Sequence, residues 1–265
     1  MKSYRNTKKI SGKETMGRRL SMAGLAILFI GLLSSFTPNW YPLDEPASNQ
    51  FGRMMQQYWT YISFVALPAG FIFASVGSYY INRFARRRWP DSKNIERPDE
   101  FLERNMKGFD DKYTYFAYSL PANYVVSGPC GILLFTVRSD KGRVTVNGDT
   151  WKEPFSLGRI FTVFAREGVG NPDRELQDQA DKIRALLSEA SAENAALFSD
   201  VPINGAVVFL NSQVELELNS PSLPALRAKQ VKDFMRRQTK EVKLPTATAR
   251  VLSDYLVEKS TYQTD

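Results

Sequence analysis

The chain has 265 residues, with 35 Lys or Arg against 28 Asp or Glu, no histidine and one cysteine, Cys130. The absence of histidine excludes Ser-His-Asp and Cys-His catalysis, and a single cysteine excludes an intramolecular disulfide and a Cys-rich zinc site. The length allows one membrane unit and one further domain of ordinary size.

Residues 1–19 carry seven Lys or Arg and one acid, and they predict a basic tail on the cytoplasmic side. Residues 20–37 and 58–81 follow as two uncharged, apolar segments. At about 1.5 Å per residue, each is long enough to cross a hydrocarbon core of about 30 Å. Pro68 lies inside the second segment, where a membrane helix tolerates it. Residues 20–82 are therefore predicted to form a transmembrane hairpin.

The charges that flank the two segments predict their orientation. Basic residues gather before the first segment and after the second, whereas the connecting loop has Arg53 against Asp44 and Glu45. Positive-inside bias then places both termini in the cytoplasm, as in a multi-pass protein of the cell membrane. An alternative is that residues 20–37 are a cleaved signal peptide, but the apolar run is long and no small-x-small site precedes Pro38.

Residues expected at the membrane interface are aromatic or basic and flank the segments. They are Arg18, Arg19, Trp59, Tyr61, Tyr79, Tyr80, Arg86, Arg87, Arg88 and Trp89. Small residues recur every four positions in the second segment, at Ala66, Gly70, Ala74 and Ser78. This stripe could pack closely on the first helix, or on a second copy in a homo-oligomer, or could reflect only the frequency of small residues in membrane helices.

Residues 83–100 are predicted to be a basic juxtamembrane linker, and residues 101–265 a soluble domain. The apolar patterns predict strands, then a long helix that opens at Asn171-Pro172, two more strands and two closing helices. This order indicates an α/β class with a mixed β-sheet flanked by helices. The strands are expected at 124–126, 131–137, 143–146, 206–210 and 214–218, the helices at 171–196, 228–238 and 247–258, and a loop at 155–170.

Residues 98–265 carry 21 basic and 23 acidic side chains, so the basic excess of the chain is juxtamembrane, where it suits topology and contact with anionic lipid. Nucleic acid remains a possible partner that the charge of the domain does not favour. A local basic face on the penultimate predicted helix is expected either to contact lipid head groups or to be an ordinary solvated face. It consists of Lys229, Lys232, Arg236 and Arg237.

The stretch from Asn123 to Gly142 contains the turn Val-Val-Ser-Gly-Pro-Cys-Gly and a strand expected to be buried. It is followed by Trp151, by the helix start at Asn171-Pro172 and by the apolar run 206–210. Over residues 101–237 this pattern resembles the nuclease-related domain (NERD) family. The resemblance implies a restriction-endonuclease-like fold, in which an Asp and a Glu-x-Lys hold a divalent metal beside the scissile phosphate and help to activate water.

At the positions that match this motif, the chain has Asn123 for the Asp, Thr136 for the Glu and Arg138 for the Lys. Neutral oxygens bind Mg²⁺ far more weakly than carboxylates, and arginine does not act as a base. The polar residue expected on the following helix is Glu175, while Gln177 and Gln179 are expected to point elsewhere.

A relocated metal site would use Asp110, Asp111 or Asp140, with Lys141 or Arg138, and Glu103 is the other carboxylate nearby in the sequence. Each of the three aspartates lies beside a glycine or another turn residue, and a turn role is the favoured interpretation. Cys130, between Pro129 and Gly131, is expected to be a passive residue of a turn.

These observations predict a membrane-anchored pseudo-enzyme without a cofactor, which acts as a binding or scaffolding module for a cytoplasmic protein partner. The alternative is a divergent membrane-associated nuclease that depends on Mg²⁺ or Mn²⁺. A third interpretation makes the hairpin the working part, but neither apolar segment contains the ionisable residues of an ion or proton path.

Overall fold

The computed structural model describes residues 1–154 and 168–262. Part of the predicted loop at 155–170 therefore lies outside the described residues. Two compact units divide the described chain: residues 12–83 form one, and residues 1–11, 84–154 and 168–262 form the other. The first is called the hairpin below, and the second is called the domain.

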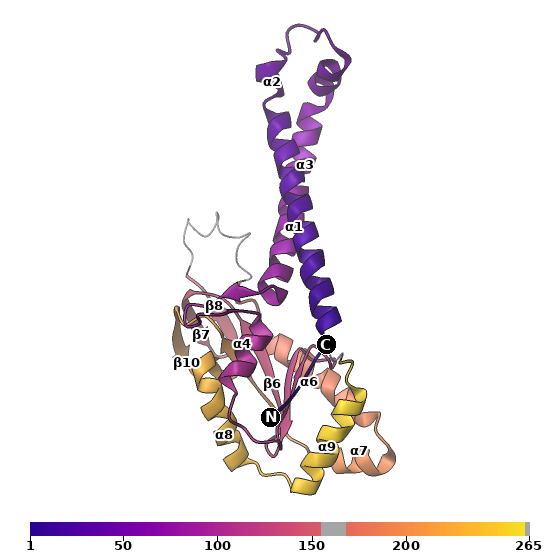
Figure 1. Cartoon of the computed structure of the whole chain (residues 1–265). Helices are drawn as coiled ribbons and strands as arrows, with labels where there is room; N and C mark the ends of the chain where they lie inside the picture. The colour runs from indigo at the N-terminus through magenta and orange to yellow at the C-terminus, as the bar shows by residue number, and fades with distance from the viewer. Residues whose placement is uncertain (155–167, 263–265) are drawn as a thin grey trace. The chain divides into compact units, whose positions relative to one another are not determined.

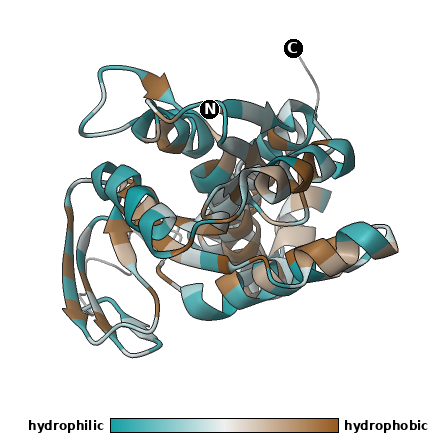
Figure 2. Cartoon of the chain, turned by 90° about the horizontal axis from the view of Figure 1, so that it is seen from below, coloured by the Kyte–Doolittle hydropathy of each residue, from teal (hydrophilic) through white to brown (hydrophobic). Residues whose placement is uncertain are grey.

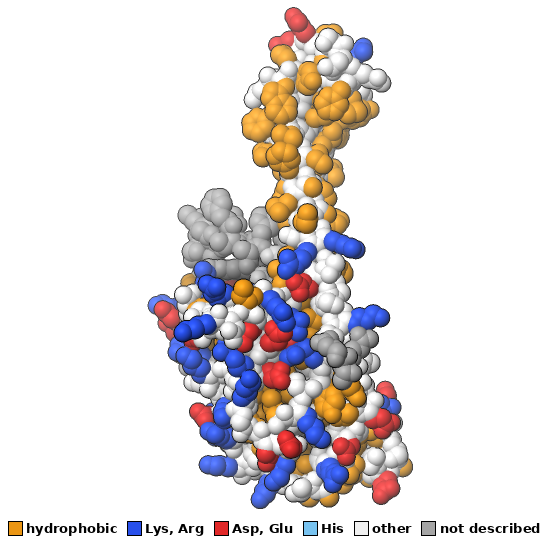
Figure 3. Space-filling model, in the orientation of Figure 1, with side chains coloured by type: hydrophobic (Ala, Val, Ile, Leu, Met, Phe, Trp, Pro, Cys, Tyr) orange, Lys and Arg blue, Asp and Glu red, His pale blue; other side chains and the backbone are white. Residues whose placement is uncertain are grey.

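The hairpin consists of α1 (Thr7–Ser35), the short α2 (Thr37–Trp40) and α3 (Gln50–Phe84). By length and composition, α1 and α3 can each cross a membrane, and only 17% of the apolar window of each is buried within the chain. Figure 3 shows hydrophobic side chains over much of the exposed surface of these helices. Both helices are longer than the predicted spans 20–37 and 58–81, because their polar ends continue the helix beyond the apolar stretch.

Small residues bring α1 and α3 into backbone contact. A Cβ on Gly24 would overlap the backbone of Ala74, a Cβ on Gly77 would overlap that of Ser21, and a Cβ on Gly31 would lie 3.0 Å from the Cβ of Ala66. Interhelical hydrogen bonds add to this contact: the Ser34 hydroxyl donates to Trp59 O at 3.1 Å, and the Ser63 hydroxyl donates to Gly31 O at 3.2 Å.

The expected stripe packs on the first helix at Ala66, Gly70 and Ala74, but Gly77 is buried in the interface where Ser78 was expected and Ser78 is only half-buried. A spacing of four drifts by about 40° per step on a helix of 3.6 residues per turn, whereas a spacing of seven drifts by about 20°. The face of α3 that contacts α1 therefore includes Gly70 and Gly77, which are seven residues apart, and does not continue as a strict repeat of four.

The domain is built around a six-stranded mixed sheet in the order β1-β4-β5-β6-β9-β11. The parallel neighbours are β1 with β4, β6 with β9, and β9 with β11, while β4, β5 and β6 are antiparallel in sequence. The predicted mixed α/β class is confirmed. The strands are β1 (Lys2–Arg5), β4 (Thr114–Ala117), β5 (Tyr124–Gly128), β6 (Gly131–Arg138), β9 (Ile203–Phe209) and β11 (Ala225–Arg227).

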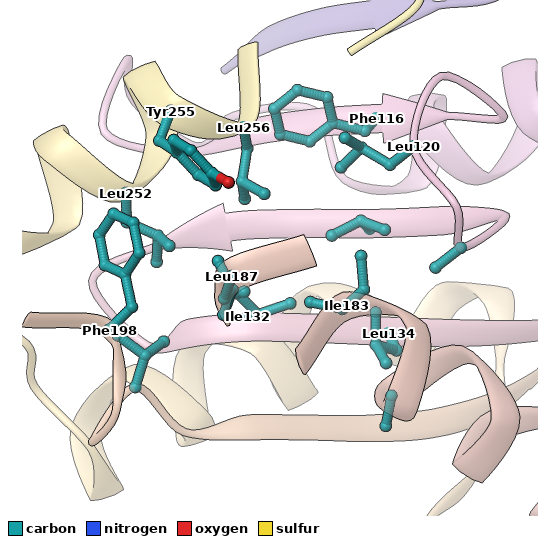
Figure 4. Packing of buried hydrophobic residues seen from close by; sticks show 14 of the residues in the cluster. Phe116, Leu120, Ile132, Leu134, Ile183, Leu187, Phe198, Leu252, Tyr255 and Leu256 are labelled. Carbon is teal, nitrogen blue, oxygen red and sulfur yellow. The ribbon is translucent and has the colours of Figure 1, made fainter. Parts of the chain in front are cut away.

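Helices cover both faces of this sheet (Figure 1). On one face, α6 (Pro172–Ser188), α7 (Ala192–Phe198) and α9 (Thr246–Lys259) pack on Ile132 and Leu134, in the apolar cluster of Figure 4. On the other face lie α4 (Pro98–Asn105), the 3-10 turn η2 (Ala228–Gln230) and α8 (Val231–Glu241), with Phe234 of α8 against Phe135. Every residue of β6 is buried, as expected for a central strand. Figure 2 shows the mixed hydrophilic and hydrophobic stretches of the surrounding helices.

A second, three-stranded sheet has the order β10-β7-β8, from β7 (Gly142–Asn147), β8 (Thr150–Lys152) and β10 (Val214–Asn219). Its apolar side packs with Val207 and Phe209 of β9 in a separate cluster. A two-stranded ribbon of β2 (Arg87–Arg88) and β3 (Ile95–Glu96) completes the domain.

The N-terminal residues correct the predicted division of the chain. Residues 1–19 are not only a tail, because Lys2–Arg5 pair with Thr114–Ala117 as the edge strand of the main sheet. Tyr4 stacks on Phe116, with ring centroids 5.6 Å apart. The predicted linker 83–100 is also structured, and Trp89, expected at the membrane interface, is a core residue of the domain that is 2% exposed.

Buried charges attach β1 to α4. Arg5 Nε lies 2.5 Å from Asp99 Oδ2, and Arg5 also contacts Glu103 at 2.6 Å. The Asp99 side chain is 1% exposed, and a second guanidinium, that of Arg97, lies 3.3 Å from it. Burial raises the pKa of Asp99, and the charges of Arg5 and Arg97 oppose that rise. The domain thus combines residues that precede the hairpin in the chain with residues that follow it.

Candidate functional site

The three positions that the NERD resemblance singles out lie close together where β5 begins and β6 ends. Val125 pairs with Leu134 in the antiparallel ladder, so the same register, continued by two residues, sets Asn123 opposite Thr136. Arg138 follows two residues later on the same face of β6, because side chains alternate along a strand. The sequence-based grouping of Asn123, Thr136 and Arg138 is therefore reproduced in space.

Helix α6 supplies the side chains that face these positions. Its N-cap residue, Asn171, accepts a hydrogen bond from Arg174 N at 3.1 Å, and Pro172 occupies the first helical position. This start sets the rotation of the helix, so that Glu175 and Gln179, four residues apart, both face β6.

Gln179 fills the space between the first two positions. Its side chain is buried, its Oε1 accepts a hydrogen bond from Asn123 N at 2.9 Å, and its Nε2 donates to Thr136 Oγ1 at 3.4 Å. The expectation that Gln179 points elsewhere is therefore wrong. Gln177, two residues from Glu175, is exposed and donates a hydrogen bond to Asp181, whereas Gln179 lies one helical turn from Glu175 on the same face.

Arg138 is held by three hydrogen bonds in a buried position. Its Nε donates to Val169 O at 2.8 Å, its Nη1 to Val137 O at 3.1 Å, and its Nη2 to Glu175 Oε2 at 2.7 Å. Only 4% of the Arg138 side chain is exposed, against 24% for Glu175. A guanidinium fixed in this way neutralises the neighbouring carboxylate and cannot take up a proton as a base.

Trp151 connects the same region to the second sheet. Its indole N–H donates to the Asp173 carboxylate in the first turn of α6, and its ring lies 6.2 Å from that of Phe209. Asp173 and Glu175 are thus both engaged by donors of the chain, the first by an indole and the second by a guanidinium.

The carboxylates considered for a relocated site do not come together. Asp110 Oδ1 accepts a hydrogen bond from Lys112 N at 3.2 Å, as in a turn, and the Asp111 side chain is 93% exposed. Both precede β4, at the end of the sheet where β6 begins, whereas Asp140 follows the end of β6 and Lys141 beside it is exposed. Eight residues of strand separate the two ends by about 25 Å, so these carboxylates cannot share one metal ion.

Among residues 1–154 and 168–262, no three Asp, Glu or Cys side chains form a group of the kind that holds a metal ion. Cys130 is buried in the turn before β6, and burial raises the pKa of its thiol, which disfavours the reactive thiolate.

Residues predicted for the membrane interface divide between the two units. In the hairpin, Tyr61 is 72% exposed and Tyr79 39%, and Arg18 pairs with Glu14. In the domain, Arg86 pairs with Glu100 at 2.8 Å, and Arg87 lies 4.1 Å from the Trp89 ring. Trp59 is half-buried, and the Lys13 ammonium group lies over the Tyr80 ring. Arg19 and Arg88 are exposed.

Comparison with known proteins adds no identification: no family, no curated protein and no solved structure matches this chain.

Proposed function

We propose that this chain is a membrane-anchored protein whose domain is a NERD-like, restriction-endonuclease-like module without nuclease activity, and that it works by binding a cytoplasmic protein partner. The observation that carries the proposal is the closed polar network at the motif positions. Gln179 bridges the main-chain N–H of Asn123 and the Thr136 hydroxyl, and Arg138 is paired with Glu175. These groups do not fit Mg²⁺, which needs carboxylates and retained waters.

The membrane part of the proposal rests on the hairpin and on β1. Two apolar helices that both cross a bilayer return the chain to the side on which it started. The pairing of β1 with β4 supports this topology, because one strand precedes α1, the other follows α3, and paired strands lie on the same side of a membrane. Basic flanks then favour the cytoplasm for the domain.

Cleavage of residues 20–37 as part of a signal peptide would remove β1 from the sheet and leave Asp99 without Arg5. The structure of the domain therefore supports an uncleaved first helix. A fragment that starts at Pro98 would lack the edge strand β1. Functional assays should therefore use the full chain, in lipid nanodiscs.

The experiment that tests the proposal restores the motif. Calorimetry measures the binding of Mn²⁺ to the full chain and to a triple variant. The variant carries Asn123→Asp, Thr136→Glu and Arg138→Lys. We expect no specific binding to the unchanged chain and measurable binding to the variant, because two carboxylates return to one site. Specific binding of Mn²⁺ to the unchanged chain would refute the proposal and favour the divergent nuclease. A variant with Gln179→Ala added tests whether the bridging amide blocks the ion.

A further inference from the structure

A pocket of about 600 Å³ opens on the face of the domain that carries α4 and α8. Its walls come from α4, from the end of β9 and from the junction of β11 with η2. They include none of the side chains that bond Arg138 or Gln179, although Leu210 N donates to Arg138 O in the sheet. The volume is in the range of small-molecule sites, which is about 300–1,000 Å³. Phe101 and Leu210 provide apolar surface, while the polar lining includes Arg104, Arg227 and Lys229.

Three cationic side chains line this pocket: Arg104 from α4, and Arg227 and Lys229 from the junction of β11 with η2. Arg227 donates to Val214 O at 3.2 Å, and within the described residues it has no carboxylate partner at salt-bridge distance. Arg104 lies over the Phe101 ring, and its Nε is buried without a hydrogen-bond partner among the described residues.

The two acids near the pocket are already engaged. Asp91 lies 2.8 Å from Lys229 and accepts a hydrogen bond from Ser212, and both contacts lower its pKa. Glu96 pairs with Arg104 at 3.0 Å. Since the Lys229–Asp91 pair is at the surface, where solvent weakens an ion pair, an incoming anion can compete for the ammonium group. The local balance is therefore positive, although acidic side chains slightly outnumber basic ones in residues 98–265.

The position of the pocket in the sheet also favours a ligand. It lies beyond the carboxyl ends of the parallel strands β9 and β11, at Leu210 and Arg227. The chain leaves β9 for β10 of the second sheet, whereas it leaves β11 for η2 and α8. In open α/β sheets, crevices at the carboxyl ends of strands where connections diverge are the usual ligand sites.

We propose that this pocket binds a molecule carrying a phosphate group, with the guanidinium of Arg227 and the ammonium of Lys229 as its main contacts. Arginine matches phosphate through two parallel hydrogen bonds, and lysine adds a point charge. The chemistry is shared by soluble phosphorylated compounds and by phosphorylated lipid head groups. The site is separate from the degenerate motif and does not depend on the proposed function.

Calorimetric titration of pyrophosphate and of ATP into the full chain, in nanodiscs of phosphatidylcholine, tests the proposal. Arg227→Gln and Lys229→Gln are each expected to weaken binding about tenfold. Asp91→Asn is expected to strengthen it, because the substitution releases Lys229. The matched control is Arg184→Gln, an exposed arginine on α6 paired with Asp181, which should leave binding unchanged.

A second set of nanodiscs with added phosphatidic acid distinguishes the two sources of phosphate. If the head group occupies the pocket, the apparent affinity for pyrophosphate falls in these nanodiscs, and Arg227→Gln removes the competition. If the ligand is soluble, the affinity is the same in both. The proposal is overturned if neither compound binds at about 1 mM in phosphatidylcholine nanodiscs, or if Arg227→Gln binds as tightly as Arg184→Gln.

Discussion

The contact between β1 and α4 predicts a large effect from one substitution, Arg5→Ala. The change removes the guanidinium 2.5 Å from Asp99 Oδ2 and leaves a carboxylate that is 1% exposed, with Arg97 at 3.3 Å as the remaining cation. Removal of one partner of a buried ion pair destabilises a fold by about 3–5 kcal/mol, and we expect about 3 kcal/mol because Arg97 stays. For a domain of this size, that corresponds to a fall in Tm of about 6–12 °C.

The assay is thermal unfolding of the full chain in nanodiscs, followed by fluorescence of the buried Trp89 and of Trp151. Arg184→Ala is the control, since an exposed pair contributes under about 1 kcal/mol. Asp99→Asn, added to Arg5→Ala, should recover part of the loss, because it removes the uncompensated charge. A fall in Tm of less than about 2 °C in Arg5→Ala would refute the structural role assigned to β1.

The pair of Arg5 and Asp99 also predicts how the stability of the fold depends on pH. The pKa of Asp99 is raised in the folded chain above its ordinary value of 3.8, chiefly by burial. The folded state therefore binds this proton more tightly than the unfolded state, so that lowering the pH through the folded pKa favours folding. Loss of Arg5 raises that pKa further. The stability gap between Arg5→Ala and the unchanged chain should narrow as the pH falls from about 7 to about 4, and a widening gap would contradict this assignment.

Two further substitutions test the hairpin and the polar network. Gly24→Ala should weaken the packing of α1 on α3 by about 1–3 kcal/mol, because the new methyl group overlaps the backbone of Ala74. Gly12→Ala, with no atom within 4 Å of the new methyl group, should leave this packing unchanged. Cross-linking of cysteines placed on the two helices reports this, and equal yields for both variants would refute the close contact. Glu175→Gln should destabilise the domain by about 3 kcal/mol in urea unfolding, because the buried Arg138 guanidinium loses its carboxylate; an unchanged midpoint would show that the pair is not structural.

Elements that depend on composition and local pattern could be predicted from the sequence. The two apolar helices follow from long uncharged stretches, and β6 follows from a continuous apolar run that only a doubly covered strand accommodates. The Asn171 cap fixed the start of α6 to the residue. The grouping of Asn123, Thr136 and Arg138 was implied only by the NERD resemblance, and the antiparallel register of β5 with β6, which sets Asn123 opposite Thr136, comes from the structure.

Elements that depend on distant partners could not be predicted. Lys2–Arg5 has no periodic pattern of its own, and its strand conformation comes from pairing with β4, far along the chain. The burial of Asp99 and Trp89 has the same origin, since both side chains complete a core that other segments form. Gln179 is a different case, because its spacing of four from Glu175 was available in the sequence and indicates a shared helix face.

The central claim, that the domain is a binding module with a closed and inactive site, is tested most directly by a cleavage assay. The full chain in nanodiscs is incubated with single- and double-stranded DNA and with RNA, in Mg²⁺ and in Mn²⁺. We predict no cleavage of any substrate. Cleavage that depends on the metal, and that is lost in an Asp140→Ala or an Asp110→Ala/Asp111→Ala variant, would contradict the claim and identify a membrane-bound nuclease.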